Sequence, residues 1–232
     1  MLLEISETPK KTFLNLCKNF ILPFKTREVF IFLKKRTDMN EFLFYCNLGV
    51  KHIMDLQAYD HFLFLVVLVL GYSNKQWKQV LWLITAFTLG HSLTLGMVLF
   101  KLLTVASEWV ELLIPATIFF TAVFKLVTAG KFNVSNPFTI ILSLCFGCIH
   151  GLGFSMYLKM LLADSTDKMT PMFAFALGVE AAQLLVVLGM ALLSILATLL
   201  FKVSKRDCVL VLSAMVIGVV LPMLLARSTF LF

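Results

Sequence analysis

Four histidines, at positions 52, 61, 91 and 150, lie inside or just before strongly apolar stretches rather than in polar loops. An ionisable side chain inside a membrane is energetically costly, so such residues usually face the bundle interior beside a partner or an ion pathway. Imidazole and carboxylate groups together suit nickel, cobalt, zinc or Cu(II), whereas magnesium and calcium require mostly oxygen ligands. The histidines therefore predict an intramembrane site for a divalent transition metal.

The first polar group, H-I-M-D-L-Q-A-Y-D-H, covers residues 52–61 at the start of the first apolar run. A carboxylate beside an imidazole fixes its tautomer and raises its basicity, so we expect Asp60 and His61 to handle metal together. His52 and Asp55 lie on the approach and are candidates for supporting the ligands or lining the entrance. Capping of a helix N-terminus is the alternative interpretation of both Asp60 and Asp55, and for Asp55 it is an equally good one.

The second and third polar groups each centre on one histidine. In T-A-F-T-L-G-H-S, residues 85–92, Thr88 precedes His91 by one helical turn and Ser92 adjoins it. In F-G-C-I-H-G-L-G-F, residues 146–154, Gly151 next to His150 lets a neighbouring helix or an ion come close to the ring. We predict both histidines as metal ligands and the two hydroxyl residues as supporting or entrance residues.

In the fourth polar group, L-G-V-E-A-A-Q at residues 177–183, Glu180 and Gln183 lie one helical turn apart, so their side chains point in the same direction. A buried carboxylate in a span without Lys or Arg needs a proton, a histidine or a metal cation. We predict Glu180 as a ligand and Gln183 as a supporting residue. In the alternative interpretation, these polar residues only hold helices together.

Helix rise relates the heights of the candidate ligands. About 1.5 Å per residue places His91 ~21 Å and His150 ~20 Å from the inner starts of their helices, and Glu180 ~12 Å below its outer start. The same reasoning puts His61 just under the outer surface. All four would lie in the outer half of a bilayer core about 30 Å thick.

The composition indicates what holds these side chains. Hydrophobic residues make up 60% of the 232 residues and charged residues 14%, too few to cover a soluble domain. Six apolar runs reach spanning length, at residues 56–73, 77–103, 109–129, 137–163, 172–201 and 208–226. We predict an all-α polytopic membrane helical bundle with about six transmembrane helices over residues 56–226.

Residues 1–55 differ from this bundle, because nine of the twenty Lys and Arg lie there between short apolar patches. We predict a basic amphipathic segment with one or two interfacial helices; a start at Met39 is a second interpretation. The basic residues of the core loops place the first, third and fifth loops in the cytoplasm and the N-terminus of the core outside. The net charge of +7 forms no stripe with stacking aromatics, which excludes nucleic acid as an expected partner and favours anionic lipid.

Four motifs, taken in order, resemble the HupE/UreJ family of nickel and cobalt permease-like membrane proteins, particularly its shorter, second-type branch. They are H-I-x6-D-H at 52–61, T-A-F-T-x-G-H-S at 85–92, H-G-x-G-F at 150–154 and G-V-E-x-x-Q at 178–183. The resemblance runs from about residue 39 to 225. It implies metal-handling roles for Asp60, His61, His91, His150 and Glu180, and an outer N-terminus of the core. The chain departs from the family at His52-Ile53, where members with a cleaved leader carry H-P, and in its basic tail.

The expected function is a permease for a divalent transition-metal ion, in a bacterial inner membrane and without nucleotide hydrolysis, since no P-loop is present. One alternative is an intramembrane zinc-dependent hydrolase of the ceramidase type, with three histidines, a bound water and Asp60 or Glu180 as base. Another is a metal-delivering accessory subunit recruited through the N-terminal segment. The expected partners are the lipid bilayer and the metal ion. A second copy of the chain or a membrane complex is a further possible partner.

Overall fold

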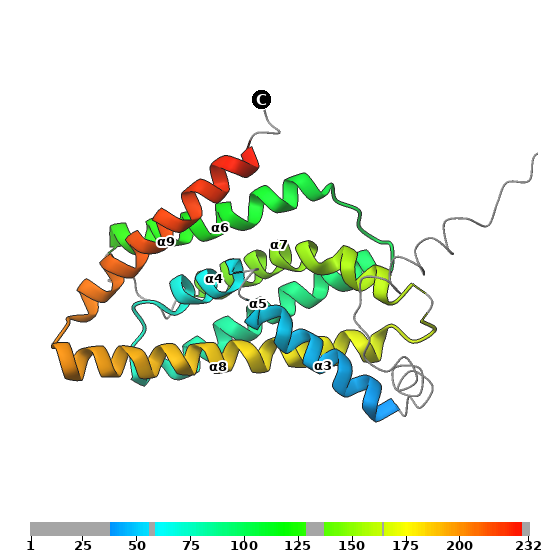
Figure 1. The fold of residues 1–232 in the computed structure, drawn as a ribbon, viewed down its shortest axis with the longest axis horizontal. Coiled ribbons are helices and arrows are strands. Elements are labelled where there is room, and N and C mark those ends of the chain that lie inside the picture. Colours follow the sequence, from blue (N-terminus) through cyan, green and yellow to red (C-terminus); the bar gives the residue numbers. More distant parts are fainter. Residues whose placement is uncertain (1–37, 56–58, 129–136, 164, 229–232) are drawn as a thin grey trace, which may run out of the picture. The chain divides into compact units, whose positions relative to one another are not determined.

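The computed structural model describes residues 38–55, 59–128, 137–163 and 165–228 (Figure 1). The interfacial helices predicted within residues 1–37 lie outside this part. The described elements are α3 Asp38–Met54, α4 Asp60–Val69, η1 Asn74–Gln76, α5 Trp77–Leu99, α6 Ser107–Thr128, α7 Pro137–Leu161, α8 Met169–Phe201 and α9 Lys205–Arg227. All are helices, which confirms the predicted class. The chain divides into two compact units, residues 1–41 and residues 42–232.

Five helices, α5 to α9, are long and apolar enough to cross a membrane. Each has at least 22 residues, and at about 1.5 Å per residue this exceeds the ~30 Å thickness of a bilayer core. Within the unit of residues 42–232, α5 packs most closely against α7, and α6 against α9 (Figure 1). The polytopic bundle predicted from the apolar runs is confirmed.

The first predicted span, residues 56–73, is the exception: a continuous spanning helix there is wrong. Helix α4 has only 10 residues, a length of ~15 Å. It ends where Gly71 takes a positive φ of 89°, a conformation that costs glycine little. Lys125 of α6 donates a 2.7 Å hydrogen bond to the carbonyl of Leu70, which stabilises the negative end of the helix.

Helix α3 precedes α4, and its residues 42–54 pack in the bundle beside α8. A Cβ built on Gly49 would overlap the carbonyl oxygen of Phe175, and one on Gly178 would overlap that of Cys46, so these glycines let the two helices touch. This packing differs from the prediction that residues 42–54 belong to an interfacial segment outside the bundle. Interfacial placement of the remainder of that segment stays a prediction.

Helices α5 and α7 cross at their glycines. A Cβ on Gly90 would overlap the carbonyl of Leu144, and one on Gly147 would overlap that of Phe87. At this close approach the hydroxyl of Ser143 donates to the carbonyl of Leu83 at 2.8 Å. Side-chain to main-chain bonds of this kind and small-residue contacts hold membrane helices in register. The register of α5 against α7 is therefore fixed on the N-terminal side of His91.

We expect Gly90→Ala and Gly147→Ala each to destabilise the bundle, because the added methyl group must push a backbone away. Overpacking of this severity costs about 3 kcal/mol. The check is the midpoint of thermal unfolding of the purified full chain in detergent. Gly189→Ala is the matched control, since a Cβ there meets nothing within 4 Å. A midpoint shift equal to that of the control would contradict the close crossing.

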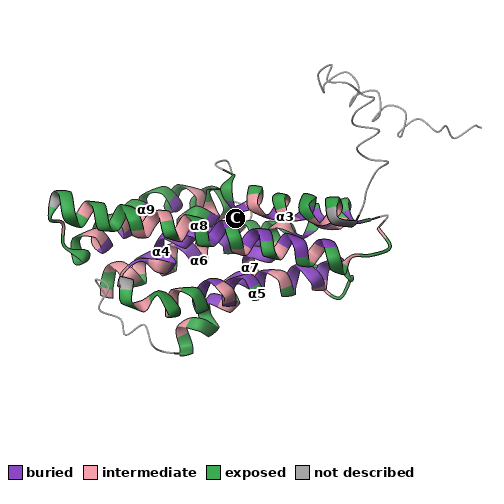
Figure 2. Ribbon diagram, turned by 90° about the horizontal axis from the view of Figure 1, so that it is seen from below, coloured by how far each residue is buried: buried purple, intermediate pink, exposed green. Residues whose placement is uncertain are grey.

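Buried residues concentrate where α4, α5 and α7 face one another, whereas much of α8 and α9 is exposed (Figure 2). Two apolar clusters form the core. On α5, Leu83 and Phe87 belong to one cluster and Leu95 and Leu99 to the other. His91 lies between them, so the histidine level is enclosed by packed apolar layers on both sides.

Candidate metal site

The four histidines come together from four helices. His52 lies near the end of α3, His61 at the start of α4, His91 in the middle of α5 and His150 in the middle of α7. The ring centroids of His52 and His61 are 4.4 Å apart, those of His52 and His91 5.7 Å, and those of His61 and His150 5.5 Å. Residues separated by up to 98 positions thus share one small volume.

The interruption between α3 and α4 creates this meeting point. His52 precedes the interruption and His61 follows it, and both touch the middle of long helices rather than their ends. The partial negative charge at the C-terminus of α3 lies beside His52 and favours a cation. Discontinuous helices in transporters characteristically expose such termini to a bound ion. His61 therefore lies at the level of the middle of α5 and α7.

His52, His61 and His91 have the geometry of a ligand set. One ligand atom from each lies within 4.8 Å of the others. Nitrogen atoms that bind one ion at ~2.1 Å in a tetrahedral arrangement are ~3.4 Å apart. A metal ion would therefore draw these rings inward by about 1 Å, a rotamer-scale adjustment.

Asp60 sets the tautomer of His61. Its Oδ1 accepts hydrogen bonds from the backbone amide of His61 at 2.8 Å and from Nδ1 of the same residue at 2.9 Å. Since the carboxylate accepts, Nδ1 carries the proton, and Nε2 is the ring nitrogen left to bind a metal ion. That Nε2 is buried and, among the described residues, has no hydrogen-bond partner. A carboxylate that orients a metal-binding imidazole has the same arrangement.

His150 is held in the same tautomer by its own helix. Nδ1 donates to the carbonyl of Phe146 at 2.9 Å, which leaves the Nε2 lone pair of the neutral ring available. In the described part of the chain this Nε2 and both ring nitrogens of His91 lack partners, and both side chains are fully buried. A buried polar atom without a partner costs about 1–3 kcal/mol. Coordination to a metal ion would satisfy the nitrogens of His91, which belongs to the three-histidine set; His150 lies outside that set and adjoins it through His61, whose ring centroid is 5.5 Å away.

We expect Asp60→Asn to weaken metal binding about 10–100-fold, because an amide orients His61 less firmly and adds no negative charge. The measurement is the Kd for Co²⁺ of the purified full chain, by competition with a chelator. Asp167→Asn, at an exposed position before α8, is the charge-matched control and should leave the Kd unchanged. An unaltered Kd in Asp60→Asn would show that the carboxylate does not support the ligand.

Two stacked pairs of phenylalanines enclose the imidazoles. Phe154 and Phe175 stack at 4.8 Å, with Phe154 4.2 Å from the ring of His52. Phe64 and Phe87 stack at 4.8 Å, with Phe64 4.9 Å from His150. These rings exclude water and present polarisable faces to a cation. Sequence reasoning missed them. Phe64, Phe87 and Phe154 each lie three or four residues from a histidine on α4, α5 and α7, a spacing that signals a shared helix face, whereas Phe175 lies on α8, which carries no histidine.

Glu180 is bonded elsewhere. Thr85 donates a 2.6 Å hydrogen bond to its Oε1, and Thr88 donates a 3.0 Å bond to Oε1 of Gln183. Thr85 precedes His91 by six residues on α5, a distance of ~9 Å along the axis. Glu180 is thus hydrogen-bonded to α5 on the N-terminal side of His91, away from the imidazoles. Within the described chain, its Oε2 and Nε2 of Gln183 are buried without partners.

The two remaining candidates lie at the margin. Asp55, just after α3, is exposed and falls outside the group of histidines that could share an ion. Ser92 is half-buried beside His91 in the sequence. The geometry therefore gives His52 a place in the ligand set and leaves these two outside it.

The fold and the gathered imidazoles define a class: a polytopic α-helical membrane protein with ligand-type side chains inside its bundle. A family model described as HupE / UreJ protein matches residues 28–228. The chain belongs to the HupE/UreJ family, which is associated with nickel and cobalt transport. This match confirms the resemblance of the four motifs and extends it before residue 39. Comparisons with curated proteins and with solved structures find no match.

Proposed function

We propose that this chain is a permease for a divalent transition-metal ion, nickel or cobalt before zinc, and that His52, His61, His91 and His150 bind the ion in transit. The observation that supports this most is a set of buried imidazole nitrogens that lie close together and have no hydrogen-bond partner in the part of the chain that the structure describes. Neutral imidazoles are intermediate ligands that suit nickel, cobalt and zinc. Membership of a family associated with nickel and cobalt transport favours the first two.

The proposed path starts at Asp60, the acidic residue that holds His61, and leads to the imidazole group. The ion exchanges part of its water shell for imidazole nitrogens there, since the neighbouring phenylalanines leave little room for water. Glu180 then receives it ~9 Å further along α5. A carboxylate oxygen with no hydrogen-bond partner among the described residues supports this second stage.

We further propose that the protein lies in a bacterial inner membrane, with the loops after α4, α6 and α8 in the cytoplasm. The basic residues of the loops support this orientation. A cation moving inward would then follow the membrane potential, worth about 2.3 kcal/mol per charge per 100 mV. No second protein is needed for this driving force.

The experiment is metal uptake by proteoliposomes that contain only the purified full chain and an internal indicator for Co²⁺ or Ni²⁺. We expect uptake above that of protein-free vesicles, increased by an inside-negative potential. Bound metal without uptake, together with cleavage of an added lipid amide, would favour the hydrolase instead. Bound metal with neither activity would favour the accessory subunit.

A further inference from the structure

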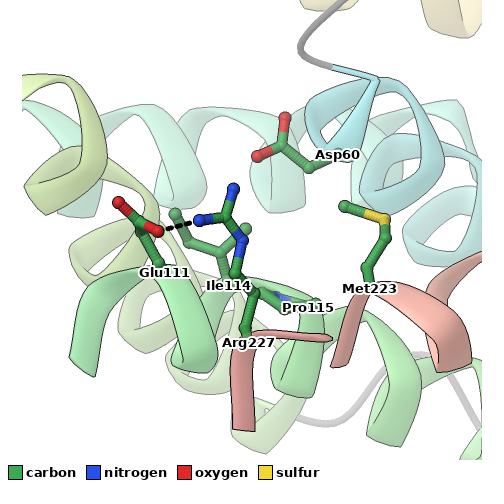
Figure 3. Close-up of a pocket in the computed structure, with 6 residues that line it drawn as sticks. All are labelled: Asp60, Glu111, Ile114, Pro115, Met223 and Arg227. Carbon is green, nitrogen blue, oxygen red and sulfur yellow. Dashed lines mark hydrogen bonds and ion pairs between the residues drawn. The ribbon is translucent and has the colours of Figure 1, made fainter. Parts of the chain in front are cut away.

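A pocket adjoins the imidazole group on the side of Asp60. It lies between α4, α6 and α9 (Figure 3). The lining residues are Asp60 from α4, Glu111, Ile114 and Pro115 from α6, and Met223 and Arg227 from α9. The carboxylate of Asp60 therefore lines the pocket and also accepts the hydrogen bond from Nδ1 of His61. The pocket leads directly to a side chain that positions a candidate ligand.

The pocket carries both signs of charge. Arg227 forms an ion pair with Glu111, and Figure 3 shows its guanidinium group directed into the space between the carboxylates of Glu111 and Asp60. The side chains of Arg227 and Glu111 are 56% and 49% exposed, and that of Asp60 is 20% exposed. Two carboxylates and one guanidinium leave the pocket with an excess negative charge, which attracts cations.

Two other sides of the imidazole group are apolar. Phe154 and Phe175 cover the group on one side, and Phe64 and Phe87 cover it on the other. His91 and His150 are fully buried, whereas Asp60 reaches the pocket. A hydrated cation is strongly disfavoured in an apolar passage, so the acidic pocket is the less costly approach.

We propose that this pocket is the entrance at which a divalent cation binds before it reaches the imidazoles, an inference that rests on the proposed function. Glu111 and Asp60 bind the arriving ion, and the guanidinium group of Arg227 occupies the same position when no ion is there. A half-exposed ion pair is weak, so an ion can separate Glu111 from Arg227 at little cost. Since attraction scales with charge, a divalent ion displaces the guanidinium group more readily than Na⁺ or K⁺ does.

The test measures how fast Co²⁺ reaches the imidazoles of the full chain in lipid nanodiscs, by stopped-flow absorption of nitrogen-bound Co²⁺. We expect Glu111→Gln to slow binding about tenfold at low salt and Arg227→Gln to accelerate it about tenfold. The absorption spectrum at saturation should be the same in all variants, since neither residue is a ligand in the final site. At 1 M salt the differences should largely disappear, because the Debye length is then only about 3 Å.

Two matched variants control for net charge. Glu108→Gln removes an exposed carboxylate three residues earlier on α6, and Lys101→Gln removes an exposed cation; neither residue lines the pocket. Both should bind Co²⁺ at the wild-type rate, and Glu111→Asp should restore most of the rate lost in Glu111→Gln. Wild-type rates in Glu111→Gln and Arg227→Gln would overturn the entrance while leaving the metal site intact. Failure of the wild-type protein to bind Co²⁺ would overturn the proposed function, and the entrance with it.

Discussion

His91→Ala is expected to abolish accumulation of nickel or cobalt by cells that express this protein. His91 is fully buried and belongs to the three-histidine set, and both of its ring nitrogens lack partners within the described chain. Loss of a residue that merely orients a ligand weakens metal binding about 10–100-fold, so loss of a central ligand should reduce accumulation by at least about 100-fold. His150→Ala should have a comparable effect. The measurement is cellular metal content by mass spectrometry, normalised to the amount of protein in the membrane.

Leu93→Ala is the control for these variants. Leu93 lies two residues after His91 on α5 and is 56% exposed on the outer face of that helix. Its truncation changes the same helix without touching the imidazoles, so we expect wild-type accumulation. Wild-type accumulation in His91→Ala and His150→Ala, at equal protein levels, would remove the permease proposal.

Glu180→Gln is expected to separate binding from transport. Because Thr85 bonds Glu180 ~9 Å along α5 from His91, a change at Glu180 leaves the imidazoles untouched. The amide keeps an oxygen for the hydroxyl of Thr85 but carries no charge with which to draw the ion onward. We therefore expect Co²⁺ affinity within about threefold of wild type, together with transport reduced by about 100-fold, a loss of ~2.7 kcal/mol.

The comparison needs both measurements on one preparation: the Kd for Co²⁺ in detergent and the uptake rate in proteoliposomes. Gln183→Glu is the reciprocal variant, since it adds a carboxylate one turn away and opposite Thr88. In the double variant Glu180→Gln with Gln183→Glu, we expect part of the transport to return. Loss of Co²⁺ binding in Glu180→Gln would instead place this carboxylate among the ligands of the imidazole site.

Much of the fold follows from hydrophobicity alone. Runs of apolar residues longer than the bilayer is thick have few alternatives to a spanning helix, because every backbone amide must be bonded within the segment. The last five predicted runs correspond to α5 through α9. The burial of His91 and His150 was predictable, because an imidazole in the middle of such a run is costly anywhere except in the bundle interior.

The first run was harder to interpret, since hydropathy cannot distinguish one continuous span from a short helix that follows an interruption. Its apolar residues continue to Leu70, but Gly71 ends the helix and Asp60 begins it. The sequence predicts His52 as a supporting or entrance residue rather than a ligand. The position of its ring depends on how α3 packs on α8, which hydropathy does not specify. The hydrogen bond of Glu180 depends on the register of α8 against α5. The similar heights of the candidate ligands in the bilayer did not specify which threonine of α5 would donate to its carboxylate.

The central claim is that imidazoles from separate helices bind one metal ion inside the bundle. The most direct test is X-ray absorption at the cobalt edge of the Co²⁺-loaded full chain, beside a His91→Ala sample. We predict one ion per chain with three or four imidazole nitrogens at about 2.0–2.1 Å, and at least one fewer, or no bound ion, in the variant. A spectrum dominated by water or sulfur ligands, or one identical in both samples, would contradict it.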